Sequence, residues 1–180
     1  NEDYEGALKD GLYAIKANAN EYEGYQLLAS IYEMDGQADK VISFKKKMLE
    51  LKPDDIELSK SLALTYYNNN EPERALEMTN GLIARYPNRD DLYVFRGNLM
   101  LNRKDLQAAK EDFDRAIAID PGNYLNYRAR SAYYGETSFP ELAREDLNQA
   151  LVLFPRFKKR SEAEAVDIRR KNDRKELEKA

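Results

Sequence analysis

Few side chains in this sequence could act as a nucleophile or a general base, because its 180 residues include no cysteine and no histidine. Thiol nucleophiles, imidazole bases and the commonest zinc ligands are therefore excluded. Two pairs of neighbouring carboxylates, Asp54-Asp55 and Asp90-Asp91, could act as acid and base. We expect each pair at the start of a helix, where carboxylates cap N–H groups and favour the helix dipole. With no phosphate-binding loop or nucleophile motif, we predict a non-catalytic chain without cofactor or metal.

Two basic runs, Lys45-Lys46-Lys47 and Lys158-Lys159-Arg160, are candidates for contact with nucleic acid. The formal net charge of the chain is -4, and no column of basic or stacking side chains recurs. Both facts oppose binding to a phosphate backbone, so we predict solvated runs and no nucleic-acid partner. No stretch approaches the ~20 apolar residues of a membrane span. We expect a soluble protein, and the lack of cysteine fits either the cytoplasm or the periplasm.

A period of 34 residues runs through the chain and must organise its helices. Four prolines keep this spacing: Pro53, Pro87, Pro121 and Pro155. Each row between them contains two amphipathic stretches of about fourteen residues, with apolar positions three or four apart as in helices. Small residues recur in both stretches, where paired helices would approach closely: Ala29, Ala63 and Gly97 in the first, and Ala75, Ala109 and Ala143 in the second.

This pattern resembles the tetratricopeptide repeat (TPR) family. The third row carries the resemblance best, with Tyr93, Gly97, Ala109, Phe113, Ala116 and Pro121. The second row departs from the signature, with Ser59 and Thr79 where aromatic residues are usual. The resemblance implies an all-α, right-handed superhelical solenoid of antiparallel helix pairs.

The same phase predicts where the repeats begin and end. Four full repeats are expected at 22–55, 56–89, 90–123 and 124–157. Residues 1–21 read as the second helix of a truncated repeat, and residues 158–180 as a charged capping helix that could also dock an acidic partner, RNA or a membrane surface. We further expect Leu8, Leu12 and Ile15 to form an apolar edge that favours self-association.

Two columns change character together along the chain. In the first two rows they are apolar, and in the last two they are charged: Leu28/Phe44, Leu62/Met78, Arg96/Asp112 and Arg130/Asp146. We predict that the two columns lie near each other, either within a repeat or from Asp112 to Arg130. The alternative is an anion-binding pair of arginines.

The resemblance also implies a binding surface, because first helices line a concave groove in that family and bind peptides or partner helices. Carried onto this chain, the candidate groove residues are Lys60, Leu64, Tyr67, Val94, Phe95, Asn98, Leu101, Asn102 and Arg128. The same columns hold Gln26, Ser30, Glu33 and Glu57. Asparagines can pair with a peptide backbone, aromatics can anchor side chains, and Lys60 and Arg128 could hold an acidic group.

Some family members clamp the C-terminal carboxylate of chaperone peptides with basic residues. Here Asp91 and Phe95 occupy the positions concerned, and one row further on they are Leu125 and Ala129. An acid at this place repels a carboxylate, so we predict no such clamp.

The sequence therefore predicts a non-catalytic protein–protein interaction scaffold with a protein or peptide partner. Two alternatives remain: a structural module that self-associates through the ends of the array, and the non-catalytic arm of a larger enzyme or secretion assembly.

Overall fold

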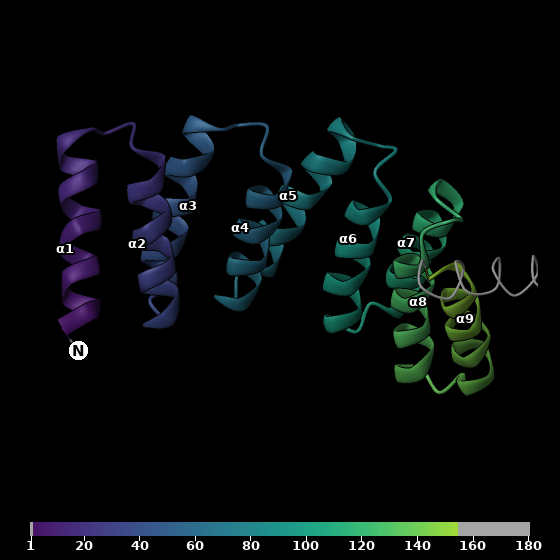
Figure 1. Ribbon diagram of the computed structural model, residues 1–180. Coiled ribbons are helices and arrows are strands. Elements are labelled where there is room, and N and C mark those ends of the chain that lie inside the picture. The colour runs from purple at the N-terminus through teal and green to yellow at the C-terminus, as the bar shows by residue number, and fades with distance from the viewer. Residues whose placement is uncertain (1, 155–180) are drawn as a thin grey trace, which may run out of the picture. The chain divides into compact units, whose positions relative to one another are not determined.

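The computed structural model describes residues 2–154, with side chains from residue 5 on, in two compact units whose boundary falls between Pro87 and Asn88. The regular elements of this part of the chain are all α-helices (Figure 1). The first unit contains α1 (Glu2–Ala17), α2 (Tyr22–Met34), α3 (Ala38–Leu51), α4 (Ile56–Asn68) and α5 (Pro72–Arg85). The second contains α6 (Asp90–Asn102), α7 (Leu106–Ile119), α8 (Tyr124–Glu136) and α9 (Pro140–Leu153).

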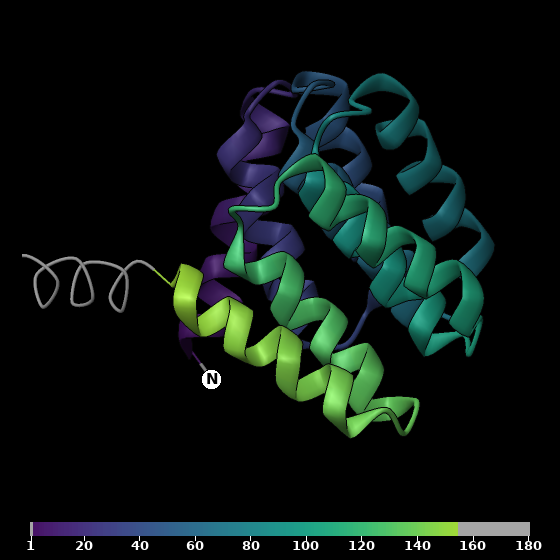
Figure 2. The same ribbon diagram turned by 90° about the vertical axis from the view of Figure 1, so that its right-hand side faces the viewer.

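The 34-residue period is present in the backbone. First helices begin at Tyr22, Ile56, Asp90 and Tyr124, and second helices at Ala38, Pro72, Leu106 and Pro140. Within each unit, every helix packs against the next in sequence, as α8 and α9 do in both views (Figures 1 and 2). The predicted all-α array of antiparallel helix pairs is thus confirmed, whereas its right-handed sense and the exact repeat boundaries stay predictions.

The turn inside each pair has one backbone conformation. Its central residue takes a positive φ in all four pairs: 69° at Gly36, 60° at Asn70, 65° at Lys104 and 65° at Ser138. The next N–H donates across the turn to a carbonyl five residues back, as from Gln37 to Tyr32 at 2.9 Å, which satisfies a free helix C-terminal group. A left-handed backbone conformation costs each non-glycine residue roughly 1 kcal/mol. The hydrogen bond that closes each turn offsets this cost.

Small residues at the helix contacts let bulky neighbours fill the core. Ala63, Ala75 and Ala109 are fully buried. The strongest case is Gly97 on α6, where a Cβ atom would lie 2.8 Å from the buried ring of Phe113 on α7. The core of the second unit therefore requires glycine at position 97.

The expected apolar N-terminal edge is partly wrong. Leu8 and Ile15 pack inward from α1 against Leu28 and its neighbours, because α1 covers α2 as a second helix of a preceding pair would. Leu12 and Tyr13 remain exposed, at 45% and 73%. The predicted capping helix at 158–180, with its basic run, lies outside the described residues.

Two glycines inside helices provide a matched test of this packing. Gly97→Ala should lower the free energy of unfolding by about 1 kcal/mol, because the methyl group overpacks against Phe113. Gly81→Ala in α5 should raise it by roughly 0.5–1 kcal/mol, because an added Cβ meets no atom within 4 Å and alanine favours helix. Urea unfolding followed by circular dichroism measures both. Equal shifts in the two variants would contradict the close approach at Gly97.

Candidate functional site

The carboxylates that could act as acid and base have structural partners. Asp55 accepts a hydrogen bond from the backbone N–H of Leu58 at 2.9 Å and caps α4, while Asp54 forms an ion pair with Arg85. Asp91 pairs with Arg89 at 2.8 Å. The first of these pairs therefore stabilises helix ends, as the sequence predicts.

Asp90 belongs to a polar junction that joins three helices of the second unit. Its carboxylate accepts hydrogen bonds from Asn123 at 2.7 Å and Asn126 at 2.9 Å. Asn126, which is buried, also donates to the carbonyls of Ala116 and Asp120 at 3.1 Å each. Its amide thus connects the start of α6 and the end of α7 with α8, so this cluster positions helices.

The predicted Arg–Asp pairs are confirmed, and both lie within a repeat. Arg96 on α6 donates two hydrogen bonds to Asp112 on α7, at 2.7 and 2.8 Å. Arg130 on α8 donates two to Asp146 on α9 at 2.8 Å and a third to Asp114 on α7 at 2.6 Å. Arg130 therefore ties α7 to α9 across α8, and its donors are engaged by carboxylates of the chain rather than by an outside anion.

In the triad of Asp114, Arg130 and Asp146, hydrogen bonds stabilise the charged forms of Arg130 and Asp114. The hydrogen bond to Asp146 raises the pKa of the Arg130 guanidinium against the opposing effect of burial. Burial raises the pKa of Asp114, but hydrogen bonds from Lys110 and Arg130 outweigh it and hold that pKa below its ordinary value. The ion pair between Arg130 and Asp114 therefore persists at neutral pH.

In the first two rows, apolar residues stand at the positions of these ion pairs. Leu28 packs in a core cluster to which Phe44 adds its ring. Leu62 and Met78 line one hollow on the second-helix side of the first unit. The coupled change in the sequence therefore marks one contact position in every repeat.

The first-helix side of the first unit carries a polar hollow of about 300 Å³ between α2 and α4. Four residues from the predicted groove columns line it: Gln26, Ser30, Glu33 and Glu57. Ser61 and Asp55 add further polar groups, and Met48 and Leu58 an apolar floor. The hollow can offer hydrogen-bond donors and acceptors to a bound chain segment.

Lys45 also lines this hollow, contrary to the expectation that its basic run is solvated. The residue is only 6% exposed. Its Nζ atom donates to Glu33 at 3.1 Å and to Ser61 and Thr65 at 2.9 Å, so that it joins α2, α3 and α4. The repeat phase could have predicted this burial. Position 45 lies 68 residues, or two repeats, before the buried Phe113 and therefore occupies the same column.

Three candidate groove residues lie on α4 in the first unit. Lys60 forms an ion pair with Glu57 at 2.9 Å, Leu64 is 45% exposed, and Tyr67 is half-buried. Leu64 thus has apolar surface available to a partner, whereas the charge of Lys60 is already paired.

The other six candidates lie in the second unit. On α6, Asn98 and Asn102 are exposed, and Phe95 and Val94 are half-buried. Arg128 on α8 is exposed as well. Leu101 needs correction, because it is only 4% exposed and packs in the core with Phe113 and its neighbours.

The side chains from residue 5 to 154 include no group of three or more acidic residues placed to hold a metal ion. Over the same part of the chain, each helix is too short or too polar to cross a membrane.

Comparison with known proteins supports the predicted 34-residue helical repeats. The sequence pattern of the tetratricopeptide repeat matches residues 91–123. The protein O-mannosyl-transferase TMTC3 of Homo sapiens is 27% identical over 139 residues, which cover 77% of this chain and 15% of that protein. ETO1-like protein 2 of Arabidopsis thaliana is 30% identical over 128 residues, covering 71% and 13%. The chain thus spans a small part of either relative.

Solved structures share the fold. A crystal structure of MamA superposes with a TM-score of 0.64 at 22% identity and covers 87% of this chain and 92% of that one. YrrB, described as a TPR protein with an unusual peptide-binding site, gives 0.57 at 19% identity and covers 86% and 79%. A MamA chain from Desulfovibrio magneticus RS-1 gives 0.63 at 18% identity and covers 83% and 85%.

The Arg130 contact can be tested by restoring the apolar version of the same position. Arg130→Leu should destabilise the chain by ~3 kcal/mol, because Asp146 is left buried without its cation. The double variant Arg130→Leu/Asp146→Met recreates the Leu62/Met78 pair and should recover most of that loss. Denaturant unfolding of both single variants and the double variant gives the coupling free energy. Additive losses would contradict the contact.

Asp114 predicts a dependence of stability on pH. Because its folded-state pKa is lowered, the carboxylate stabilises the fold above its unfolded pKa of ~3.9, and this contribution is lost as the pH falls through the folded value. The stability difference between wild type and Asp114→Asn should therefore be largest near pH 7 and vanish in strong acid. Unfolding curves from pH 7 downward measure it. A difference that stays constant with pH would show that the charge of Asp114 is not involved.

Proposed function

Because the chain belongs to the tetratricopeptide repeat family, we propose that it is a non-catalytic scaffold for protein–protein interaction that binds a peptide or partner segment on its first helices. Proteins of this family are generally interaction modules without catalytic activity. The observation that carries the proposal is the polar hollow between α2 and α4 of the first unit. The family resemblance implies that residues there face a groove, and they line an open hollow of about 300 Å³.

The second unit contributes polar groups of the same kind. Asn98 and Asn102 lie one turn apart on α6 and are both exposed. An asparagine amide both donates and accepts, so such a pair can bind the N–H and C=O groups of an extended chain. YrrB, which has a similar fold, is itself described as binding peptide, and this supports the same role here.

The groove does not suit a chaperone-type terminal carboxylate. Asp91, which stands where that clamp needs a basic residue, forms an ion pair with Arg89, and Phe95 is half-buried. Around the hollow of the first unit, Glu33, Asp55 and Glu57 outnumber the buried Lys45. We infer a partner bound through its backbone and neutral or basic side chains.

The first-helix surface can be tested by partner capture. Asn98→Ala/Asn102→Ala should deplete specific partners from co-purification with the chain, quantified by mass spectrometry. Helicity and melting temperature should stay unchanged, since both side chains are exposed. Asn148→Ala, an exposed asparagine on the second helix α9, is the matched control and should retain every partner. The same partners in both variants would refute the groove.

Two observations favour other roles. Leu12 and Tyr13 expose apolar surface on α1, which suits self-association. Sedimentation at increasing concentration tests this role, since Leu12→Ser/Tyr13→Ser should abolish any concentration-dependent gain in mass.

The match to only 15% of the mannosyl-transferase suits a non-catalytic arm of a larger enzyme.

A further inference from the structure

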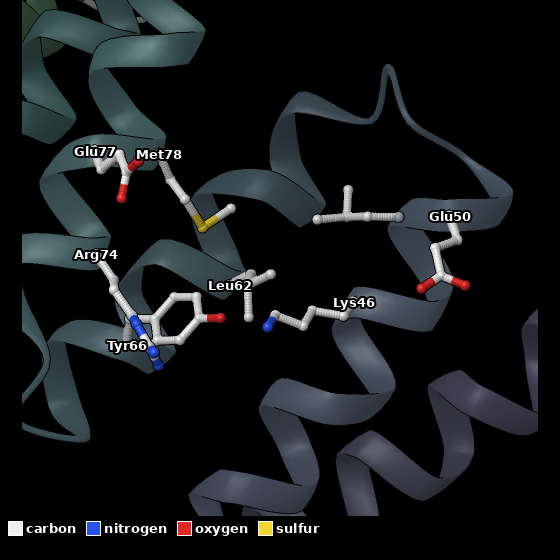
Figure 3. A pocket seen from close by; sticks show the side chains of 8 residues that line it. Lys46, Glu50, Leu62, Tyr66, Arg74, Glu77 and Met78 are labelled. Carbon is white, nitrogen blue, oxygen red and sulfur yellow. The ribbon is translucent and has the colours of Figure 1, made fainter.

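The second-helix side of the first unit carries a hollow separate from the proposed groove. It has a volume of about 460 Å³ and lies between α3 and α5, with α4 beneath (Figure 3). Leu62 and Tyr66 on α4 form its floor, and Leu49 and Met78 its apolar walls. The floor residues Leu62 and Tyr66 are buried, and the half-buried Leu49 and Met78 present apolar surface between two helices that run in the same direction.

The second unit shows what fills this position elsewhere in the chain. Residues 68 positions further on are Asp114, Arg130 and Asp146 in place of Lys46, Leu62 and Met78. There the Arg130 side chain bridges Asp114 and Asp146 and occupies the space between α7 and α9. In the first unit no such bridge can form, because leucine is short and apolar and Lys46 carries the opposite charge to Asp114. The hollow is thus the same site without its internal side chain.

The rim of the hollow carries opposite charges. Lys46 reaches from α3 toward the ring of Tyr66, with its Nζ atom 5.9 Å from the ring centroid (Figure 3). Arg74 lies 5.6 Å from the same centroid and is ion-paired with Glu71. Among the described residues, neither Lys46 on the α3 rim nor Glu77 on the α5 rim has an ion-pair partner. Each rim can therefore still attract one charge.

We propose that this hollow is a second docking site, which takes an amphipathic helix of a partner protein. Apolar side chains of that helix enter between α3 and α5 and pack against Leu49 and Met78, above the buried Leu62. An acidic residue on one flank pairs with Lys46, and a basic residue on the other flank pairs with Glu77. Two helices forming a groove suit a third helix as guest, because its i and i+4 side chains project along one line.

The site shares no lining residue with the polar hollow between α2 and α4, so each of the two hollows can be tested separately. The opposite charges of the two rims also give specificity. A guest helix with the same charge on both flanks would be repelled by the rim that carries that charge.

Three synthetic helical peptides of about 15 residues test the site by fluorescence anisotropy. They share leucines at i and i+4 and differ in their flanks, which carry glutamate and lysine, glutamate only, or lysine only. The mixed peptide should bind about threefold more tightly than either other peptide. Absence of binding by the mixed peptide, or equal binding by all three, would overturn the proposal.

Two variants of the hollow and one control variant in the second unit locate the binding. Lys46→Asp/Leu62→Arg/Met78→Asp copies the triad of the second unit into the hollow, and should abolish binding while helicity is retained. Lys46→Glu alters only an exposed residue and makes both rims acidic, so the lysine-only peptide should then bind best. Asn98→Ala/Asn102→Ala should leave all three affinities unchanged, which separates this site from the groove. Wild-type preference in Lys46→Glu would overturn the proposal even where the triple variant failed to fold.

Discussion

Close approach of the two helices in each pair is the constraint on which the rest of the structure depends. Ala63 and Ala75 are fully buried where α4 meets α5, and Gly97 leaves room for the Phe113 ring. A larger residue at any of these positions would separate the helices and open the core. Because the contact recurs every 34 residues, the pairs inside each unit join in the same way, through α3 and α4 in the first unit and through α7 and α8 in the second.

At some partly buried positions, one repeat has a charged side chain where another repeat has an apolar one. Arg130 bridges two helices of the second unit, while Leu62 occupies the matching place in the first and leaves a hollow. Lys45 stands where Phe113 fills the second unit, and it is satisfied by Glu33, Ser61 and Thr65. The repeat backbone thus accepts either a charged or an apolar side chain at the same position, and around Leu62 the apolar choice leaves a hollow.

Periodicity alone predicted the array and the coupled Arg–Asp columns, because both follow from which residues share a phase. It failed at Lys45. Three consecutive lysines favour an exposed helix face, whereas the Lys45 side chain is buried in the structure. The family resemblance placed Leu101 in the groove, yet it lies near the end of α6 and packs in the core. Phase gives the face of a helix, whereas burial near a helix end depends on the neighbour packed there.

The left-handed residue at the centre of each intra-pair turn has a consequence for how the chain can vary. Glycine, asparagine, lysine and serine occupy that position with nearly equal φ, so the turn tolerates different side chains. It does not tolerate a change in length. One inserted residue would rotate the following helix by about 100° about its axis and carry Ala75 or Ala109 away from the contact. These turns therefore accept substitutions but not insertions, and this accounts for the unbroken 34-residue period of the sequence.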